Sequence, residues 1–154
     1  MLLAKLVKAL EKSEVEYAIV GGVALALHGA PRGTVDIDFV IRHTEKGFIA
    51  VEAALKNLGF LPRLPVTAKE IFYFKKEYIQ KRNLIAWSFY NPVNPVEVID
   101  IILTHDLSAL KSTPKNLNHL KLHVVAIEDL IKMKQLSGRP QDLEDIKMLK
   151  KLKS

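Results

Sequence analysis

The sequence contains no cysteine. Disulfide scaffolds, thiolate zinc sites, cysteine-ligated iron–sulfur clusters and cysteine nucleophiles are therefore excluded. Long apolar runs are also missing, because the longest mostly apolar stretch, residues 18–30, is shorter than the ~20 residues that a membrane span needs. Lysines interrupt residues 1–12, which lack the apolar region and cleavage site of a signal peptide. These absences predict a cytoplasmic protein with no membrane partner.

Several common catalytic motifs are absent as well. The sequence has no GxxxxGK[ST] phosphate loop, no GxGxxG dinucleotide fingerprint and no GxSxG nucleophile motif. His119 and His123 are four residues apart, but they form no HExxH zinc motif. The histidines therefore show no metal-ligand pattern.

The composition that remains is that of a globular protein. The chain has 154 residues, 49% hydrophobic and 26% charged, which fits one domain and excludes a disordered or collagenous chain. The 23 basic and 17 acidic residues give a net charge of +6. A basic surplus of this kind favours an anionic partner such as a nucleotide or a nucleic acid.

Hydrophobic periodicity and turn residues predict alternating helices and strands. This alternation favours an α/β or α+β fold built on a mixed sheet, with residues 1–154 forming a single domain. The expected helices are residues 2–12, 23–28, 45–58, 104–110, 126–135 and 140–152, and the expected strands are residues 17–20, 35–41, 71–75, 84–90, 96–103 and 121–125.

A glycine pair, Gly21 and Gly22, lies between a predicted buried strand and a short helix. Glycine lets the backbone approach a ligand closely, and free N–H groups at the start of a helix attract anions. The pair is equally explained by a tight strand-to-helix turn. It therefore indicates a phosphate site only together with other features.

Asp36 and Asp38 lie in the predicted strand 35–41 and share one of its faces. Two adjacent carboxylates repel each other, and a divalent cation such as Mg²⁺ relieves that repulsion. A solvated strand face would also explain them, although aspartate is disfavoured in strands. The pair is therefore a candidate metal site.

Asp100 is the single carboxylate in residues 98–102, the apolar part of the predicted strand 96–103, and Glu97 of the same strand is the poorer candidate. A buried, unpaired carboxylate is costly, so we expect it to have a partner. If this strand lies next to strand 35–41, three carboxylates can hold two metal ions ~3.5–4 Å apart, as in phosphoryl transfer. The alternative is a salt bridge from Asp100 to a neighbouring lysine or arginine.

Together, residues 19–29 and 32–41 resemble the signature of the nucleotidyltransferase superfamily. That signature is a glycine pair, a gap, and then Asp-apolar-Asp, and here the 13 residues 23–35 form the gap. The Arg-x-Thr-x-Asp-Ile-Asp variant is most similar to the AbiEii-type toxins of type IV toxin–antitoxin systems. Lincosamide nucleotidyltransferases share a similar pattern.

The resemblance implies a polymerase-β palm fold, a short mixed sheet flanked by helices, with further helices at the C-terminus. It also implies a cofactor, Mg²⁺, as two ions for which Mn²⁺ can substitute. The implied metal ligands are Asp36, Asp38 and Asp100, and Asp100 would also assist deprotonation of the attacking hydroxyl. The implied nucleotide-binding residues are Gly21, Gly22, Arg32, Thr34 and Lys134.

Two charged regions keep alternative interpretations. Lys134 would reach a nucleotide phosphate, but it also fits a solvated helix face. Asp142, which follows Arg139 into the last helix, also suits a helix N-terminus. Residues 63–83 hold six basic and two acidic residues interleaved with aromatics, which suits either nucleic-acid binding or an ordinary solvated surface over core aromatics.

The sequence therefore predicts a Mg²⁺-dependent nucleotidyltransferase. It would transfer a nucleoside monophosphate from a nucleoside triphosphate to a hydroxyl of a tRNA 3′ end or other RNA, a protein or a small molecule. The resemblance adds a role in a toxin–antitoxin system, with a cognate toxin or antitoxin as partner. The alternative is a non-catalytic nucleotide- or partner-binding module on the same fold.

Overall fold

The computed structural model describes residues 1–30 and 36–153. Within them, no helix is long and apolar enough to cross a membrane. The helices are α1 (Leu2–Lys12), α2 (Gly21–Leu27), α3 (Glu45–Asn57), α4 (Ala68–Arg82), α5 (Ile127–Ser137), α6 (Pro140–Lys153) and the 3₁₀-helix η1 (Leu107–Ala109). The strands are β1 (Tyr17–Val20), β2 (Ile37–Ile41), β3 (Leu61–Pro62), β4 (Ala86–Tyr90), β5 (Val98–Ile102), β6 (Ser112–Leu117) and β7 (Leu120–Val125).

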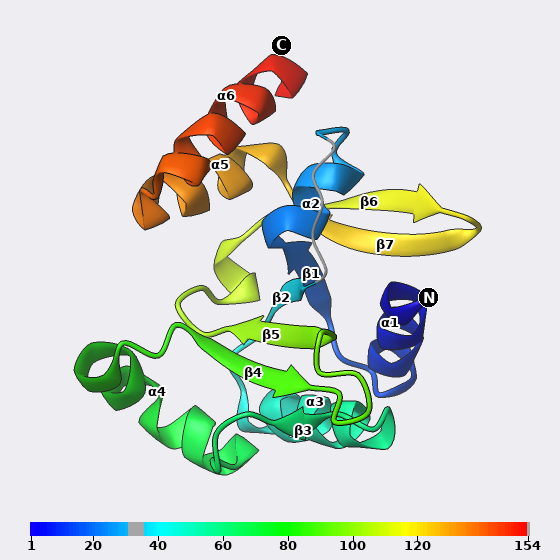
Figure 1. The fold of residues 1–154 in the computed structure, drawn as a ribbon, viewed down its shortest axis with the longest axis vertical. Coiled ribbons are helices and arrows are strands. Elements are labelled where there is room, and N and C mark those ends of the chain that lie inside the picture. The colour runs from blue at the N-terminus through cyan, green and yellow to red at the C-terminus, as the bar shows by residue number, and fades with distance from the viewer. Residues whose placement is uncertain (31–35, 154) are drawn as a thin grey trace.

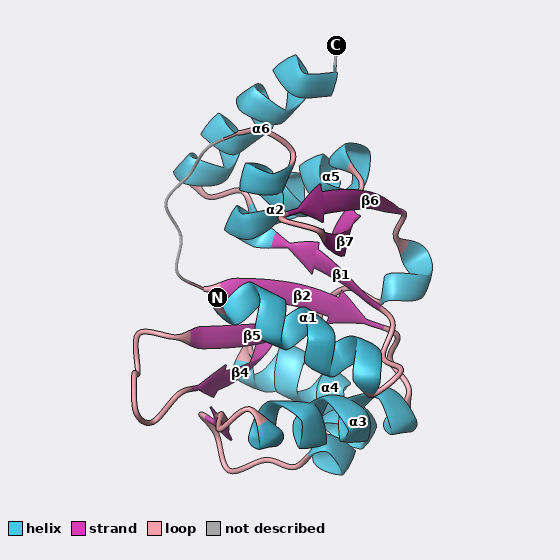
Figure 2. Ribbon diagram, turned by 90° about the vertical axis from the view of Figure 1, so that its right-hand side faces the viewer, coloured by secondary structure: helices cyan, strands magenta, loops and turns pink. Residues whose placement is uncertain are grey.

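These strands form one mixed sheet in the order β3-β4-β5-β2-β1-β7-β6 (Figure 1). The pairs β2–β5 and β1–β7 are parallel, and the other neighbours are antiparallel. Helices α1 and α3 lie against the sheet (Figure 2). Helices α5 and α6 lie at the same end of the molecule as β6 and β7. The predicted mixed α+β fold is therefore confirmed.

Strand alternation separates an apolar row of side chains from a polar one. Register partners across β4, β5, β2, β1 and β7 form a row in which every side chain is buried: Trp87, Ile101, Phe39, Ile19 and Val124. Phe48 of α3 packs on Trp87, so α3 covers this face. The next register row contains Ser88, Asp100, Asp38 and Val20. Because successive residues of a strand point to opposite faces, this second row faces away from α3.

The predicted strand 71–75 is wrong, because these residues lie in α4. Thr67 and Glu70 form a reciprocal capping box that starts the helix, and Ala68 and Ile71, three residues apart, are its buried residues. Tertiary packing of this apolar stripe overrides the strand propensity of the Ile-Phe-Tyr-Phe run. The helix is kinked at Phe74, whose backbone is non-helical.

Other differences are smaller. The predicted helix 104–110 is only the 3₁₀-helix η1, and its N-cap is Asp106. Strands β3 and β6 were not predicted; β6 is an edge strand with Pro114 and alternating exposure, which gives little apolar signal. Helix α2 begins at Gly21 rather than at residue 23. The first residue of the predicted strand 35–41 lies outside the described residues.

Candidate active site

Asp38 and Asp100 occupy the same register position on the neighbouring parallel strands β2 and β5. The adjacency on which the three-carboxylate hypothesis depended is therefore present. Both side chains are half-buried and belong to the polar row of the sheet. The fold thus brings together two carboxylates that are 62 residues apart in the sequence.

The carboxyl of Asp38 is strongly perturbed. Burial, together with the charge of Asp100 and a hydrogen bond to it, raises the pKa of Asp38 to about 7. Asp36 raises this pKa further by its charge, whereas the cation of Lys134 lowers it. The ordinary pKa of an aspartate is close to 4. Because two negative carboxylates at this site repel each other, the site favours a proton or a cation between them.

One of the two carboxylate oxygens of Asp100 accepts no hydrogen bond from the described residues. Its Oδ1 is buried and has no hydrogen-bond partner among the described residues. The predicted alternative, a salt bridge from Asp100 to a lysine or arginine, is likewise not found within residues 1–30 and 36–153. A buried carboxylate oxygen without a donor is suited to a cation or to a substrate hydroxyl.

These observations fit a bound Mg²⁺. Hard cations take carboxylate oxygens, and Mg²⁺ in particular is held by one or two carboxylates plus substrate phosphates. In the described residues, no group of three or more acidic or histidine side chains is arranged to hold a metal by itself. Asp38 and Asp100 therefore form the core of the site, and Asp36, just before β2, is coupled to it by charge.

Gly21 makes the close approach that its residue type suggests. Its φ is +69°, and a Cβ at this position would lie 2.3 Å from Oδ2 of Asp38. The preceding Val20 is the register partner of Asp38, so the end of β1 is held directly against the carboxylate. Glycine is needed here because any side chain would displace Asp38.

Two predicted nucleotide-binding residues, Arg32 and Thr34, lie outside the described residues. Gly22 is the second residue of α2, directly after Gly21. The nucleotide-binding roles of Gly22, Arg32 and Thr34 therefore rest on the sequence resemblance.

Lys134 of α5 is buried and already paired. Its Nζ lies 2.9 Å from Oδ2 of Asp145 and 3.4 Å from Oδ1 of Asp142, and all three residues are less than 10% exposed. Asp142 also accepts a hydrogen bond of 3.0 Å from Nε of Arg139. Although burial opposes it, hydrogen bonds from Arg139 and Ser137 hold the pKa of Asp142 well below its usual range. The solvated-face interpretation of Lys134 is therefore wrong. Asp142 does lie in the first turn of α6, where it accepts a hydrogen bond of 3.2 Å from the backbone N–H of Arg139, and it pairs with Lys134 as well.

A pocket of about 380 Å³ joins Asp38 and Gly21 to the α5–α6 region. One part of its wall is apolar, with Ile85, Ile102 and Met133, and another is polar, with Lys134 and Arg139. Thr104 and His105 complete the wall after β5. Sequence reasoning missed these two residues, because nothing in the sequence alone places residues 104 and 105 beside Asp38.

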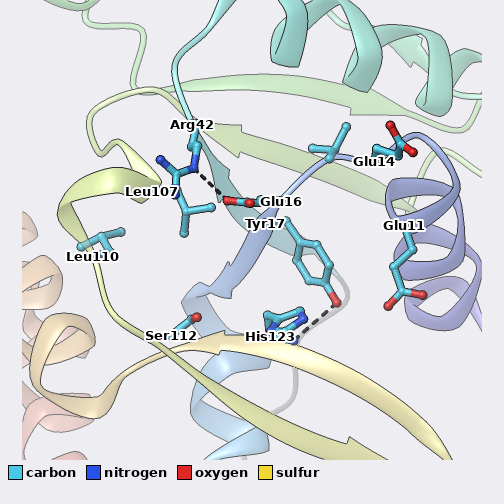
Figure 3. A pocket seen from close by; sticks show the side chains of 10 residues that line it. Glu11, Glu14, Glu16, Tyr17, Arg42, Leu107, Leu110, Ser112 and His123 are labelled. Carbon is cyan, nitrogen blue, oxygen red and sulfur yellow. Dashed lines mark hydrogen bonds and ion pairs between the residues drawn. The ribbon is translucent and has the colours of Figure 1, made fainter.

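A second pocket, of about 550 Å³, lies around the start of β1, at the end away from Gly21 (Figure 3). Figure 3 shows Glu16 paired with Arg42, and the hydroxyl of Tyr17 directed towards His123. This second pocket is larger than the pocket beside Asp38, but none of the predicted site residues lines it. The carboxylate pair, rather than pocket size, therefore locates the candidate site.

The family of the chain follows from its sequence over nearly its whole length. Residues 2–152 match the model of the family described as "Nucleotidyltransferase of unknown function (DUF6036)". The chain belongs to this family. Of the predictions from residues 19–41, membership of a nucleotidyltransferase family is therefore confirmed, and the AbiEii-type branch stays a hypothesis. No curated protein matches the sequence.

Solved nucleotidyltransferases share the fold of this DUF6036 protein. The antibiotic-resistance factor ANT(2'')-Ia aligns with a TM-score of 0.65 and 12% identity, over 96% of this chain and 80% of that one. The lincomycin-bound lincosamide antibiotic adenylyltransferase LnuA gives 0.62 and 18% over 97% and 95%. A putative nucleotidyltransferase from Thermotoga maritima gives 0.62 and 16% over 95% and 88%. At these identities the likeness shows the fold alone.

Proposed function

We propose that this DUF6036 nucleotidyltransferase transfers a nucleoside monophosphate from a nucleoside triphosphate to a hydroxyl acceptor. The acceptor oxygen forms a bond to the α-phosphorus while the bond to pyrophosphate breaks, and the electron pair leaves with pyrophosphate. The observation that carries the proposal is the Asp38–Asp100 register pair, with the raised pKa of Asp38 and the partnerless Oδ1 of Asp100.

Asp38 and Asp100 would hold Mg²⁺, with Asp36 as a third carboxylate near it. When bound, the ion neutralises phosphate charge and the charge that develops on the leaving group. The charge repulsion that raises the pKa of Asp38 is the same repulsion that a cation removes. The fit rests on these carboxylates and not on the likeness to other proteins.

The acceptor hydroxyl must lose a proton as it attacks. We assign this proton to Asp100, as the sequence resemblance implies, and the observation that supports the assignment is that its Oδ1 has no donor among the described residues. A carboxylate within hydrogen-bond reach of the hydroxyl acts as a general base in this way. Asp38 is the other carboxylate of the pair, and its burial and the neighbouring Asp100 raise its pKa.

Gly21 and Gly22 would let the triphosphate approach the carboxylates along the backbone, because Gly21 already touches Asp38. Among the cations of the pocket, Arg139 is better placed than Lys134 to meet a phosphate. Its side chain is 71% exposed, whereas the side chain of Lys134 is 8% exposed. To bind phosphate, Lys134 would have to give up its ion pairs with the buried Asp142 and Asp145, which is costly.

The likeness to antibiotic adenylyltransferases supports a small hydroxyl compound as one class of acceptor. The net charge of +6 supports RNA as another. A toxin–antitoxin role, with Arg32 and Thr34 beside the metal, remains a hypothesis that rests on the sequence resemblance. The alternative function, a non-catalytic nucleotide-binding module, predicts Mg²⁺-dependent nucleotide binding without transfer.

The experiment is transfer of label from each α-³²P nucleoside triphosphate, with Mg²⁺, to total RNA, to the protein itself, and to lincomycin or tobramycin. Asp38→Asn is the inactive variant, and Gly59→Ala, a change at a surface turn, is the matched control. Label that requires both Mg²⁺ and Asp38 supports transferase activity and identifies the acceptor. Mg²⁺-dependent nucleotide binding without pyrophosphate release in the presence of any acceptor supports the binding module instead.

A further inference from the structure

The C-terminal half of α4 stands apart from the rest of that helix. Before the kink at Phe74, the helix is fixed by the buried residues Ala68 and Ile71 and by Phe72, which packs on Phe48. After the kink, residues 75–82 include no buried side chain. This half-helix is therefore a surface feature, shown at the lower left of Figure 1.

The half-helix concentrates positive charge. Residues 75–82 contain four basic side chains and one acidic side chain, a net charge of +3 out of +6 for the chain. Lys76, Lys81 and Arg82 are exposed. Arg82 also lies over the ring of Tyr78, 5.9 Å from its centroid. The surface suits a polyanion.

Two aromatic side chains at the kink are also exposed. Tyr73 is 61% exposed and Phe74 is 52% exposed. The sequence left open whether these aromatics belong to the core, and the structure answers for these two: they do not. Exposed rings beside cations form the stacking platform that single-stranded nucleic acids bind, because every base offers a flat face.

Two connections join this surface to the pocket beside Asp38. Nζ of Lys75 lies 2.7 Å from Nδ1 of His43, and the pKa of His43, lowered mainly by burial, is also influenced by the backbone of His105, a pocket residue. Ile85 lines the pocket only three residues after Arg82, a chain distance of at most ~11 Å. The basic surface and the pocket are therefore neighbours.

We propose that the C-terminal half of α4, with Tyr73 and Phe74, binds a single-stranded nucleic acid whose terminal hydroxyl enters the pocket as the acceptor. Phosphates would contact Lys76, Lys81 and Arg82, and bases would stack on Tyr73 and Phe74. The inference rests on the proposed transfer reaction and names its acceptor class. A small acceptor would need the pocket alone and would leave this surface unused.

Binding is tested by fluorescence anisotropy with fluorescein-labelled single-stranded RNA and DNA of about 12 nucleotides. The variant is Lys76→Glu/Lys81→Glu/Arg82→Glu. The matched control, Lys5→Glu/Lys8→Glu/Lys12→Glu, makes the same charge change at exposed positions of α1. We expect at least a tenfold loss for the α4 variant, a salt dependence lowered by ~2 in slope, and less than a threefold loss for the control.

The aromatic contribution is tested with Tyr73→Ala/Phe74→Ala, for which we expect at least a fivefold loss, with polyglutamate as a charge-only competitor. The inference is overturned if the wild type binds neither oligonucleotide, if the two triple variants weaken binding equally, or if polyglutamate competes as well as RNA does. Tighter binding of RNA or of DNA identifies which acceptor is used.

Failure of this inference and failure of the proposed function are distinguishable. Mg²⁺-dependent triphosphate binding uses Asp38 and Asp100, which the α4 variants leave unchanged. If triphosphate binding is intact and no oligonucleotide binds, the acceptor inference is wrong and the transferase proposal stands. If oligonucleotides bind at α4 but no triphosphate binds, the proposed function is wrong.

Discussion

Asp38 and Asp100 face each other across two parallel strands, and the pKa of Asp38 rises to about 7 as a result of its burial and of this neighbour. Val20 of β1 is the register partner of Asp38, and the next residue, Gly21 at the start of α2, lies so close that a Cβ on it would be 2.3 Å from Oδ2 of Asp38. Three strands thus contribute to one small region on the face away from α3. The following predictions test the consequences of this arrangement.

The carboxylate pair predicts that Asp38→Asn stabilises the metal-free protein at alkaline pH. Because the pKa of Asp38 in the folded protein lies above its ordinary value of 3.8, folded Asp38 retains its proton between about pH 4 and 7, and its contribution to stability is lost as the pH rises through 7. At ~1.4 kcal/mol per pKa unit, the gain from the variant at pH 8 is at most about 4 kcal/mol.

Urea unfolding with EDTA at pH 4 and pH 8 measures this effect. We expect the stabilities of the two proteins to approach each other at pH 4, near the unfolded-state pKa of the carboxyl, and Mg²⁺ to stabilise the wild type, but not the variant, at pH 8. An equal pH dependence of the unfolding free energy in both proteins would show that the pKa of Asp38 is not raised in the folded protein.

The contact of Gly21 with Asp38 predicts a steric effect on activity. Gly21→Ala places a Cβ 2.3 Å from Oδ2 of Asp38, so the carboxylate must leave its present position beside Asp100. A displacement of ~1 Å at reacting groups can cost about 100-fold in rate. We expect a loss of that order in transfer or, before an acceptor is known, in Mg²⁺-dependent triphosphate affinity.

Gly59→Ala is the matched control for Gly21→Ala. Gly59 also has positive φ, +90°, but nothing lies within 4 Å of a Cβ there. It should cost ~1–2 kcal/mol of stability from backbone strain and leave nucleotide binding unchanged. Equal losses of nucleotide affinity in the two variants would contradict a specific role for Gly21.

The buried cluster around Lys134 predicts a large loss of stability. Lys134→Met leaves Asp142 and Asp145 buried without their shared cation, and breaking a buried pair costs ~3–5 kcal/mol. Chemical denaturation measures this loss. Lys150→Met, on the exposed surface of α6, is the control and should change stability by less than ~0.5 kcal/mol. A small effect of Lys134→Met would mean that Lys134 is free to bind phosphate.

Arg139 predicts a different signature. Its side chain is exposed and pairs with Asp142, so Arg139→Gln should change stability by less than ~1 kcal/mol. If its remaining N–H groups meet the triphosphate, the KM for nucleotide rises about tenfold or more, as expected for a lost charge-assisted contact. Steady-state kinetics or calorimetric titration measures this, and an unchanged nucleotide affinity would exclude Arg139 from the site.

The fold brings together three of the candidate site residues that the sequence singled out, Gly21, Asp38 and Asp100, whereas part of α4 was predicted as a strand. Gly21, Asp38 and Asp100 stand out because glycine and aspartate are poor strand residues, so each needs a reason to lie in or beside an apolar strand. That β2 and β5 are neighbours could only be assumed from the sequence, because strand order in a mixed sheet depends on long-range pairing. The signal for α4 was present in Thr67 and Glu70, but strand propensity outweighed it in the prediction.

The surroundings of Lys134 show a second limit. Its charge and helical position were evident from the sequence, yet its burial depends on how α5 packs against α6. Asp145 becomes a partner only through this packing. His105 and Ile85 likewise join the pocket through the paths of the chain after β5 and α4. Local sequence carries no information about such contacts.

The most direct test of the account is calorimetric titration of nucleoside triphosphates, with and without Mg²⁺, into the wild type, Asp38→Asn, Asp100→Asn and the Gly59→Ala control. This measurement does not depend on knowing the acceptor. We predict Mg²⁺-dependent binding to the wild type and to Gly59→Ala, and its loss in both aspartate variants. Binding that survives in Asp38→Asn and Asp100→Asn, or that does not require Mg²⁺, would contradict the assignment of the carboxylate pair.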